Sequence, residues 1–239
     1  PVLATECGFD SLARHHFMAG KAMQIDTELS LADFDFDLPR ELIAQYPLAD
    51  RAASRLLHVA RGTFEDRHFS DIEWLLRDDD LLVFNDTKVI PARLVGRKES
   101  GGKVELLLCE PLAGALGRRW RALGQASKVI RAGSLLAFDG LAARVVESEG
   151  EGFYVVELDR EGEALEAALG RAGSIPLPPY IRRAPDARDD TRYQTIWARA
   201  PGSAAAPTAG LHFTEALVAR LEGRGVRRTA VTLHVGPGT

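Results

Sequence analysis

The sequence predicts a mixed α/β protein with a small antiparallel β-barrel inserted into its main domain. Residues 23–91 and 166–239 combine helical periodicity with short apolar strands, whereas residues 92–165 consist of short apolar runs separated by glycine turns. Strands at this spacing are typical of a small barrel or sandwich. We therefore expect the two outer segments to form one discontinuous α/β domain around a barrel of residues 92–165.

The first outer segment predicts alternating helices and strands. A helix is expected over residues 37–46, because Pro39 suits the first turn of a helix and Tyr46 precedes a proline, a position that avoids the helical region. Residues 69–77 have the apolar spacing of a helix. Apolar runs at residues 55–59 and 80–84 predict strands on either side of it.

The inserted segment and the second outer segment continue this pattern. A helix is expected over residues 161–172, and another over 214–224, capped by Thr214 and ended by Gly225. Residues 226–233 predict a strand. The six barrel strands are expected at residues 92–96, 103–109, 119–123, 134–138, 142–147 and 153–158.

The two ends of the chain differ from the rest. Residues 1–22 have neither a signal-peptide core nor an amphipathic transit pattern, and Met23 opens a run that resembles the start of a domain. We interpret residues 1–22 as a non-native or disordered extension. Because Pro-Gly punctuation before Thr239 normally leads into another element, we expect a further C-terminal part.

Composition predicts a cytoplasmic protein without a disulfide framework. Hydrophobic residues make up 46% and charged residues 27%, an ordinary soluble balance. No apolar run approaches the roughly 20 residues that span a bilayer. Cys7 and Cys109 lie far apart without C-x-x-C spacing, which argues against a disulfide scaffold and a thiolate zinc site.

Charge is unevenly distributed along the chain. Residues 88–131 carry 10 basic and 3 acidic residues, and residues 171–239 carry 10 and 5, within a chain of net charge −4. Two basic blocks on an acidic body can form a phosphate-binding face. Ordinary solvated surface charge is the alternative interpretation.

Three polar segments are candidates for a ligand site. In the first, an apolar strand ends in Asn85-Asp86-Thr87-Lys88, with Arg93 following. Strand ends of this kind are where α/β proteins place ligands. A polar turn with surface Lys and Arg is the alternative.

The second candidate is the small-residue run at 204–210. Small residues let the backbone approach a ligand, and Thr208, Ala209 and Gly210 precede a predicted helix, whose free N–H groups favour carboxylates. His212 can act as an acid or base near neutral pH. A structural histidine between Leu211 and Phe213 is the alternative.

The third candidate, at 233–239, is a strand leading into a glycine turn that contains His234, Gly236 and Gly238. The Gly-x-Gly lacks the third glycine of a dinucleotide fingerprint, and the chain has no P-loop. His212 and His234 are not in a metal-ligand motif, so no metal is expected. No G-x-S-x-G elbow supports a hydrolase triad.

The chain resembles a known enzyme family. FDLPRELIAQYPL, SRLL, FNDTKVIPARL, GGKVELLL, LPPYIRR, YQTIWA, AAAPTAGLHFT and LHVGPGT, in this order, are similar to the S-adenosylmethionine:tRNA ribosyltransferase-isomerases of queuosine biosynthesis. The resemblance covers nearly all of residues 23–239. It implies an α/β domain with an inserted barrel, and transfer of the ribosyl group of S-adenosylmethionine to 7-aminomethyl-7-deazaguanine at the tRNA wobble position, giving epoxyqueuosine, adenine and methionine. It also implies a reaction that needs no metal or separate cofactor, since S-adenosylmethionine is consumed as a substrate. We expect the protein to be a monomer.

The resemblance suggests roles for the polar segments. Asp86 is expected near the cationic sulfonium, and His212 or His234 is expected to act as the base or as the acid that protonates adenine. Thr208, Ala209 and Gly210 would hold the methionine carboxylate, while Tyr180 and Tyr193 would stack on a base. The remaining expected substrate-binding residues, four of them cationic groups for tRNA phosphates, are Lys88, Arg93, Arg182, Arg183, Asn85, Thr87, Gln194, Gly236 and Gly238.

Two other classes of function remain open from the sequence. A non-catalytic RNA-binding module would use the basic barrel as oligonucleotide-binding barrels do. A conventional S-adenosylmethionine-dependent methyltransferase would need a glycine-rich loop after its first strand, and residues 55–70 contain none.

Overall fold

The computed structural model describes residues 30–112, 114 and 116–236. The extension predicted for residues 1–22 and the candidate residue Gly238 lie outside the described residues. The chain divides into two units, one up to Ile43 and one from Ala44 to Gly238. The described part of the first unit contains two 3-10 turns, η2 (Leu31–Phe34) and η3 (Arg40–Leu42).

The prediction of a helix over residues 37–46 is wrong. Only the three residues of η3 are helical, and Ile43 already has an extended backbone with ψ 104°. Leu38 and Leu42 are 42% and 71% exposed. A short helix that buries no apolar face lacks the tertiary packing that stabilises most helices, so a single turn is what forms.

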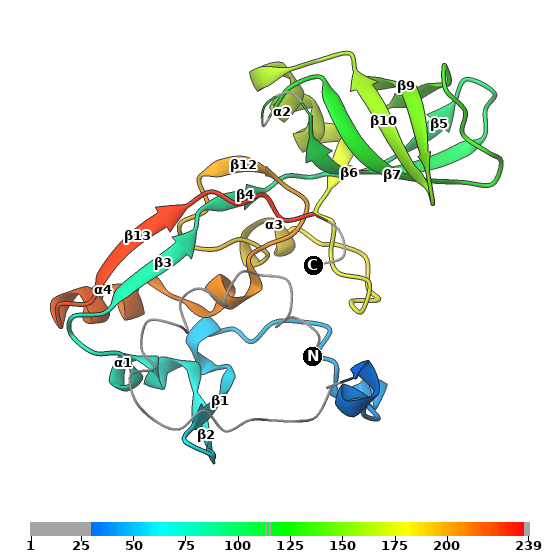
Figure 1. Ribbon diagram of the computed structural model, residues 1–239. Coiled ribbons are helices and arrows are strands. Elements are labelled where there is room, and N and C mark those ends of the chain that lie inside the picture. Colours follow the sequence, from blue (N-terminus) through cyan, green and yellow to red (C-terminus); the bar gives the residue numbers. More distant parts are fainter. Residues whose placement is uncertain (1–29, 113, 115, 237–239) are drawn as a thin grey trace. The chain divides into compact units, whose positions relative to one another are not determined.

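The second unit contains a closed antiparallel barrel, which confirms the predicted fold class (Figure 1). Strands β5 (Arg93–Lys98), β6 (Lys103–Pro111) and β7 (Arg119–Ala126) are joined through β10 (Phe153–Leu158) and β9 (Leu141–Gly150) to β8 (Leu135–Phe138). Pairing of Arg97 with Ala137 and of Lys98 with Leu136 then closes β8 onto β5. A two-residue strand, β11 (Gly173–Ser174), adds to the other side of β5.

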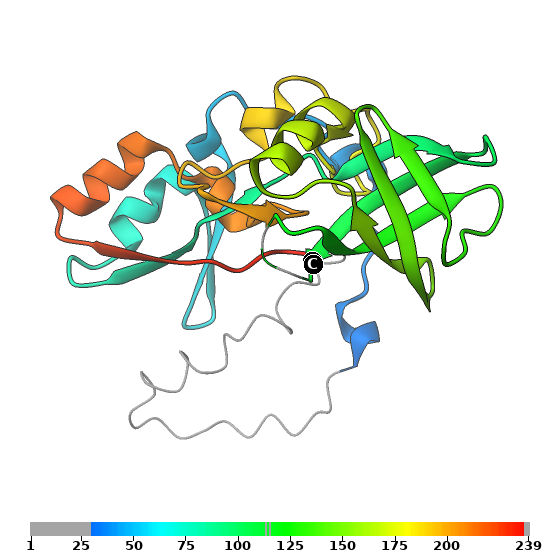
Figure 2. The same cartoon turned by 90° about the horizontal axis from the view of Figure 1, so that it is seen from above.

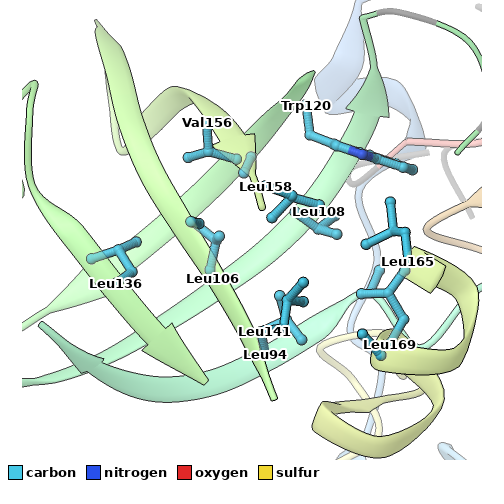
Figure 3. Close-up of a cluster of buried hydrophobic side chains, with 14 of the residues drawn as sticks. Leu94, Leu106, Leu108, Trp120, Leu136, Leu141, Val156, Leu158, Leu165 and Leu169 are labelled. Atoms are coloured by element: carbon cyan, nitrogen blue, oxygen red, sulfur yellow. The ribbon is translucent and has the colours of Figure 1, made fainter. Parts of the chain in front are cut away.

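The barrel interior is filled by aliphatic side chains (Figure 3). Alternate residues of each strand point inward, as in β6, where Val104, Leu106 and Leu108 are fully buried. Trp120 is also fully buried and donates its Nε1–H to the Gly117 carbonyl at 2.7 Å. Each such side chain contributes about 1.5–3 kcal/mol through burial.

Helix α2 (Gly162–Ala172) covers one end of the barrel. Figure 3 shows Leu165 and Leu169 of this helix reaching the same cluster as the strand side chains. Leu165, Ala168 and Leu169 are spaced three and four apart, so they lie on one helix face. The helix expected over residues 161–172 is therefore confirmed.

Outside the barrel, two pairs of parallel strands bring distant parts of the chain together (Figures 1 and 2). Strand β3 (Leu81–Asn85) pairs with β13 (Arg227–Val231), and β4 (Thr87–Val89) pairs with β12 (Ala200–Ser203). Helix α4 (Glu215–Gly223) connects η6 (Thr208–His212) to β13. As predicted, the Thr214 hydroxyl caps α4, accepting from the Leu217 N–H at 3.2 Å.

An aromatic cluster packs this part of the unit. Phe84 stacks on Trp197 with ring centroids 3.8 Å apart, and Phe213 meets Phe69 and Phe84 edge to face. Leu217 and Leu221 of α4 complete the cluster. The helix predicted over residues 69–77 is shorter than expected, since it consists of η5 (Phe69–Asp71) and α1 (Ile72–Leu75).

Three further elements complete the unit: a hairpin and two short helices. Strand β1 (Arg55–Ala60) was predicted, but its partner β2 (Thr63–His68) was not, because the sequence TFEDRH is largely polar. Turn η4 (Arg51–Ala53) precedes the hairpin, and α3 (Asp189–Arg192) follows the proline-rich loop after β11. None of the helices in the described part of the chain has the length and apolar character needed to cross a bilayer.

Candidate functional site

The polar residues at the end of β3 lie beside the segment that follows β13. The Asn85 side-chain amide donates to the Leu233 carbonyl at 2.7 Å and accepts from the Leu233 N–H at 3.0 Å. These two hydrogen bonds resemble those between neighbouring strands, and they extend the hydrogen-bonded pairing of β3 and β13 beyond the last residues of the two strands. Asn85 thus positions the chain that carries His234.

Asp86 is a buried carboxylate whose two oxygens are both engaged. Its side chain is 4% exposed, Oδ1 accepts from the Thr232 hydroxyl at 2.6 Å, and Oδ2 accepts from Arg199 at 2.6 Å. The Thr232 hydrogen bond, together with Arg199, lowers the pKa of the Asp86 carboxyl below its ordinary 3.8 despite burial, which acts in the opposite direction. This carboxylate therefore holds β13 and the residue before β12, and its expected place near the sulfonium stays a prediction.

Replacing Asp86 with asparagine is expected to lower the free energy of unfolding at neutral pH by about 1–3 kcal/mol, because a charge-assisted hydrogen bond is lost. Folding lowers the pKa of the Asp86 carboxyl. Its contribution to the free energy of unfolding is therefore fully present at a pH above the ordinary carboxyl pKa, and it is lost as the pH falls through the lowered pKa of the folded protein. The difference between wild type and variant should therefore shrink on acidification. Denaturant unfolding at several pH values measures it, with exposed Asp139→Asn as control. A difference that is independent of pH would contradict this account.

His234 is fixed by a buried threonine and a glycine. Its Nδ1 lies 2.8 Å from the hydroxyl of Thr87, a side chain with no exposed surface. The ring packs against Gly202, where a Cβ would come within 2.9 Å of it. Gly202 has φ +138°, a conformation that L side chains rarely adopt, so glycine is required there on two grounds. Among the described residues, His234 Nε2 has no hydrogen-bond partner.

His234 lines a cavity of about 360 Å³, which we call the His234 cavity. The described residues around it also include Cys109, Glu110, Arg121 and Phe153. Burial raises the pKa of the Cys109 thiol to about 11, so this group is neutral at physiological pH and unsuited to nucleophilic attack.

Two charged groups in the wall of this cavity differ in their partners. Arg121 bonds Glu149 at 2.6 Å and lies 4.1 Å from the centre of the Phe153 ring. Glu110 is exposed and forms no ion pair among the described residues. A β-bulge between Leu108 and Glu110 turns the carboxylate out of the strand's alternation. Sequence reasoning missed all five barrel residues of this wall, which are Cys109, Glu110, Pro111, Arg121 and Phe153. The adjacent Cys109-Glu110 at the end of an alternating run was the available signal.

Gln194 and Tyr193 support the site rather than line it. The Gln194 amide accepts from the Val89 N–H at 3.0 Å and donates to the Val89 carbonyl at 2.7 Å, which completes the hydrogen bonds of β4. Tyr193 packs against a small cluster that contains Val89 and Ala206. Burial raises the pKa of its phenol. Tyr193 therefore packs under β4, and its expected stacking on a base stays a prediction.

A second cavity, of about 760 Å³, borders the barrel and the proline-rich loop; we call it the arginine cavity. Its lining includes Arg93, Arg182 and Arg183, all expected to contact phosphates. Arg93 bonds Glu105 at 2.8 Å, whereas Arg182 is exposed and has no ion pair among the described residues.

Arg183 has a structural role that the sequence did not indicate. It makes two hydrogen bonds, of 2.6 and 2.7 Å, to the carboxylate of Asp189 and lies over the Tyr46 ring. Only 14% of its side chain is exposed. Its guanidinium thus fixes the loop, and its expected contact with a phosphate stays a prediction.

Two further residues expected to contact tRNA are exposed. Lys88 lies 3.7 Å from Glu166 of α2 in a half-exposed pair, which is of little energetic weight. Tyr180 is 52% exposed and therefore free to stack on a base. Neither lines the two cavities described above.

The segment around His212 is not part of the His234 cavity. His212 ends η6 and packs on Phe69, with ring centroids 5.2 Å apart, so the aromatic cluster accounts for it. Thr208, Ala209 and Gly210 belong to η6, a separate turn, and α4 begins only at Glu215. These three residues therefore lie one turn before α4, and their expected role in holding the methionine carboxylate stays a prediction.

The structure thus brings together Asn85, Asp86, Thr87, His234 and Gly236, and separates them from His212. Within the described residues, no three His, Cys, Asp or Glu side chains are grouped closely enough to hold a metal ion. The arrangement offers an oriented imidazole at the wall of a cavity between a glycine turn and the barrel. Such a group can transfer a proton to or from a bound ligand.

Comparison with known proteins identifies the family. The profile of the family described as "Queuosine biosynthesis protein" matches residues 31–239. The chain belongs to this family.

Named relatives of this queuosine biosynthesis protein are close in sequence. It is 74% identical to the S-adenosylmethionine:tRNA ribosyltransferase-isomerase of Anaeromyxobacter sp. (strain Fw109-5), over 88% of this chain and 61% of the relative. It is 54% identical to the protein of that name from Xanthomonas euvesicatoria, over 87% and 58%. The solved S-adenosylmethionine tRNA ribosyltransferase of Thermotoga maritima is 31% identical over 85% and 58%, with a TM-score of 0.34. The chain spans about three fifths of the length of these relatives.

Proposed function

We propose that this queuosine biosynthesis protein transfers and isomerises the ribosyl group of S-adenosylmethionine onto 7-aminomethyl-7-deazaguanine in tRNA, releasing adenine and methionine. The names of its relatives support S-adenosylmethionine and tRNA as substrates and ribosyl transfer with isomerisation as the reaction type. The observation that carries the proposal in this chain is His234, held by Thr87 against Gly202 at the wall of the 360 Å³ cavity.

The reaction needs proton transfer at two points. A positive sulfonium acidifies the adjoining ribose carbon, from which a base removes a proton, and adenine leaves more easily once protonated. The Thr87 hydroxyl can accept from or donate to His234 Nδ1, and the two tautomers make Nε2 a proton acceptor or a donor. One imidazole can therefore serve either step.

Because both oxygens of Asp86 are already hydrogen-bonded, this proposal assigns the carboxylate that faces the sulfonium to Glu110. It lies in the wall of the His234 cavity without an ion pair among the described residues. A cationic sulfonium in this cavity would be attracted to it, because charges a few ångströms apart near a protein surface interact by several kcal/mol. In this proposal Glu110 orients S-adenosylmethionine, and His234 acts on its ribose.

The tRNA is proposed to approach the arginine cavity. Arg182 is exposed there and has no ion pair among the described residues, and Tyr180, nearby in sequence, is 52% exposed. A guanidinium suits a backbone phosphate, and an exposed ring suits an unstacked base of a single-stranded loop. S-adenosylmethionine is consumed as a substrate, so no separate cofactor is part of the proposal.

The test is an incubation of the protein with S-adenosylmethionine and tRNA carrying 7-aminomethyl-7-deazaguanine, followed by mass spectrometry of nucleosides and small molecules. We expect epoxyqueuosine together with equal amounts of adenine and methionine. Release of S-adenosylhomocysteine would instead establish a methyltransferase. If the protein binds tRNA but no new nucleoside forms, the protein would instead be a non-catalytic RNA-binding module.

A further inference from the structure

A third cavity opens at the rim of the barrel, away from the strand ends that hold His234. It has a volume of about 610 Å³ and is formed by the turn after β5, the loop after β7 and the residues leading into β8. We call it the rim cavity. Its described lining residues are Lys98, Glu99, Ser100, Ser127, Lys128, Val129, Arg131, Ser134 and Leu135.

Lys98 is a buried cation in the floor of this cavity. The residue is 9% exposed, and its Nζ donates to the Lys128 carbonyl at 2.9 Å. It lies on the seam that closes the barrel, where it pairs with Leu136. It forms no ion pair within the described part of the chain. Because an ammonium has three N–H donors and a buried charge is costly unless compensated, an anion is the expected partner.

Lys128 and Arg131 lie in a loop whose backbone is fixed by a buried side chain and by hydrogen bonds. Ile130 between them is buried in the barrel core. The Arg131 N–H bonds the Ser134 hydroxyl at 3.2 Å, and the Ser134 N–H bonds the Arg131 carbonyl at 3.0 Å. Both cationic side chains are exposed and lack ion pairs among the described residues. Their charges are therefore presented by backbone that is already ordered.

These three cations differ from others in the basic stretch of residues 88–131. Lys88, Arg93 and Arg121 each lie within 4 Å of a carboxylate. Around the rim cavity, three positive charges face the single carboxylate of Glu99, and three serines add hydroxyl donors. The described lining of the rim cavity thus carries a net positive charge.

We propose that the rim cavity binds backbone phosphates of RNA, a second point of attachment that lies apart from the His234 cavity. The inference rests on the proposed function for the identity of the polyanion. No aromatic residue lines the cavity among the described residues, so it offers nothing for a base to stack on. Lysine, arginine and serine donors are what phosphate contacts use, and such contacts position an RNA without reading its sequence.

The test compares tRNA binding by the wild-type protein and by the double variant Lys128→Ala with Arg131→Ala. Fluorescence anisotropy at several salt concentrations gives Kd and its salt dependence. We expect the double variant to raise Kd about ten-fold and to reduce the slope of log K against log salt by about 1 to 2, because each lost phosphate contact removes 0.7–0.9 of slope.

A control double variant, Arg119→Ala with Arg227→Ala, removes the same charge from exposed positions outside the three cavities. Arg119 begins β7, and the rim cavity follows the end of that strand, about 23 Å away at 3.3 Å per residue. The control should change Kd at most two-fold. An equal loss of affinity in both double variants, or none in either, would overturn the proposal. Circular dichroism of each variant verifies that it is folded.

Two parallel measurements separate this inference from the proposed function. Titration with AMP and with inorganic phosphate tests for a free anion: loss of AMP binding in the Lys128/Arg131 variant, with tRNA affinity intact, would overturn the RNA assignment. Adenine release tests the reaction, and the variant should raise KM for tRNA without changing kcat. If tRNA binding depends on Lys128 and Arg131 while the wild type releases no adenine, the rim cavity stands and the proposed reaction fails.

Discussion

The His234→Ala variant is expected to release adenine 10²- to 10⁴-fold more slowly than the wild type at saturating S-adenosylmethionine and tRNA. Loss of a positioned general acid or base has an effect of this size. His212→Ala is the matched comparison, because this ring packs on Phe69 and does not line the His234 cavity. It should keep kcat within about three-fold and lose about 1 kcal/mol of stability through the lost ring contact. Equal kcat losses in both variants would remove the role assigned to His234.

Substitution of Gly202 tests the position of the His234 ring without removing it. An alanine Cβ would come within 2.9 Å of the imidazole, so the ring must shift, and a shift of about 1 Å can lower the rate about 10²-fold. Gly62→Ala is the control, since Gly62 has φ +81° but no atom within 4 Å of an added Cβ. It carries similar backbone strain without displacing the ring. A Gly202→Ala protein with normal kcat would show that the ring position is unimportant.

The second large expected effect is on the free energy of unfolding. Alanine substitution should lower it at Gly173 and raise it at Gly170, three residues away. Gly173→Ala is expected to lower the free energy of unfolding by about 3 kcal/mol, because its Cβ would overlap the Pro91 carbonyl oxygen and lie 2.9 Å from the Leu169 carbonyl oxygen. Gly170→Ala is expected to raise it by about 0.5–1 kcal/mol, because this exposed position lies in α2 with open space around it.

Denaturant unfolding of the two variants beside the wild type measures both effects. The substitution is chemically the same in each case, so differences in side-chain hydrophobicity or composition cancel. Destabilisation of similar size by Gly170→Ala would show that the end of α2 is packed differently from this description.

The barrel was predictable because its strands obey a local rule. In β6, Val104, Leu106 and Leu108 alternate with less buried residues, and glycine turns separate this strand from its neighbours. The polar strand β2 has no such alternation and was missed. The helix expected over residues 37–46 had suitable end signals but no buried face, and end signals alone do not form a helix.

The site was only partly predictable, for a physical reason. Asn85, Asp86 and Thr87 were suggested by their place at a strand end, and His234 by the glycine turn after it. The contact between Thr87 and His234 depends on the parallel register of β3 and β13, which no local pattern encodes. Whether Asp86 and Arg183 are available to a ligand depends on Thr232, Arg199 and Asp189, which tertiary packing supplies.

The two kinds of strand pairing described above differ in when they can form. All six pairings between neighbouring barrel strands are antiparallel, and several join strands that follow each other directly, such as β5, β6 and β7 or β8, β9 and β10. Closing short loops is fast and entropically cheap. The hydrogen bond between Thr87 and His234 instead spans 147 positions, and the one between Asp86 and Thr232 spans 146.

Loop closure over such distances is slow, so the barrel is expected to be folded before the strand ends meet. An early barrel also shortens the effective path between them, since the chain enters the barrel at β5 and leaves after α2 at β11, which pairs with β5. The folded barrel would then hold the two outer segments of the chain close together. The His234 imidazole would form its contact with Thr87 last, after the barrel has folded.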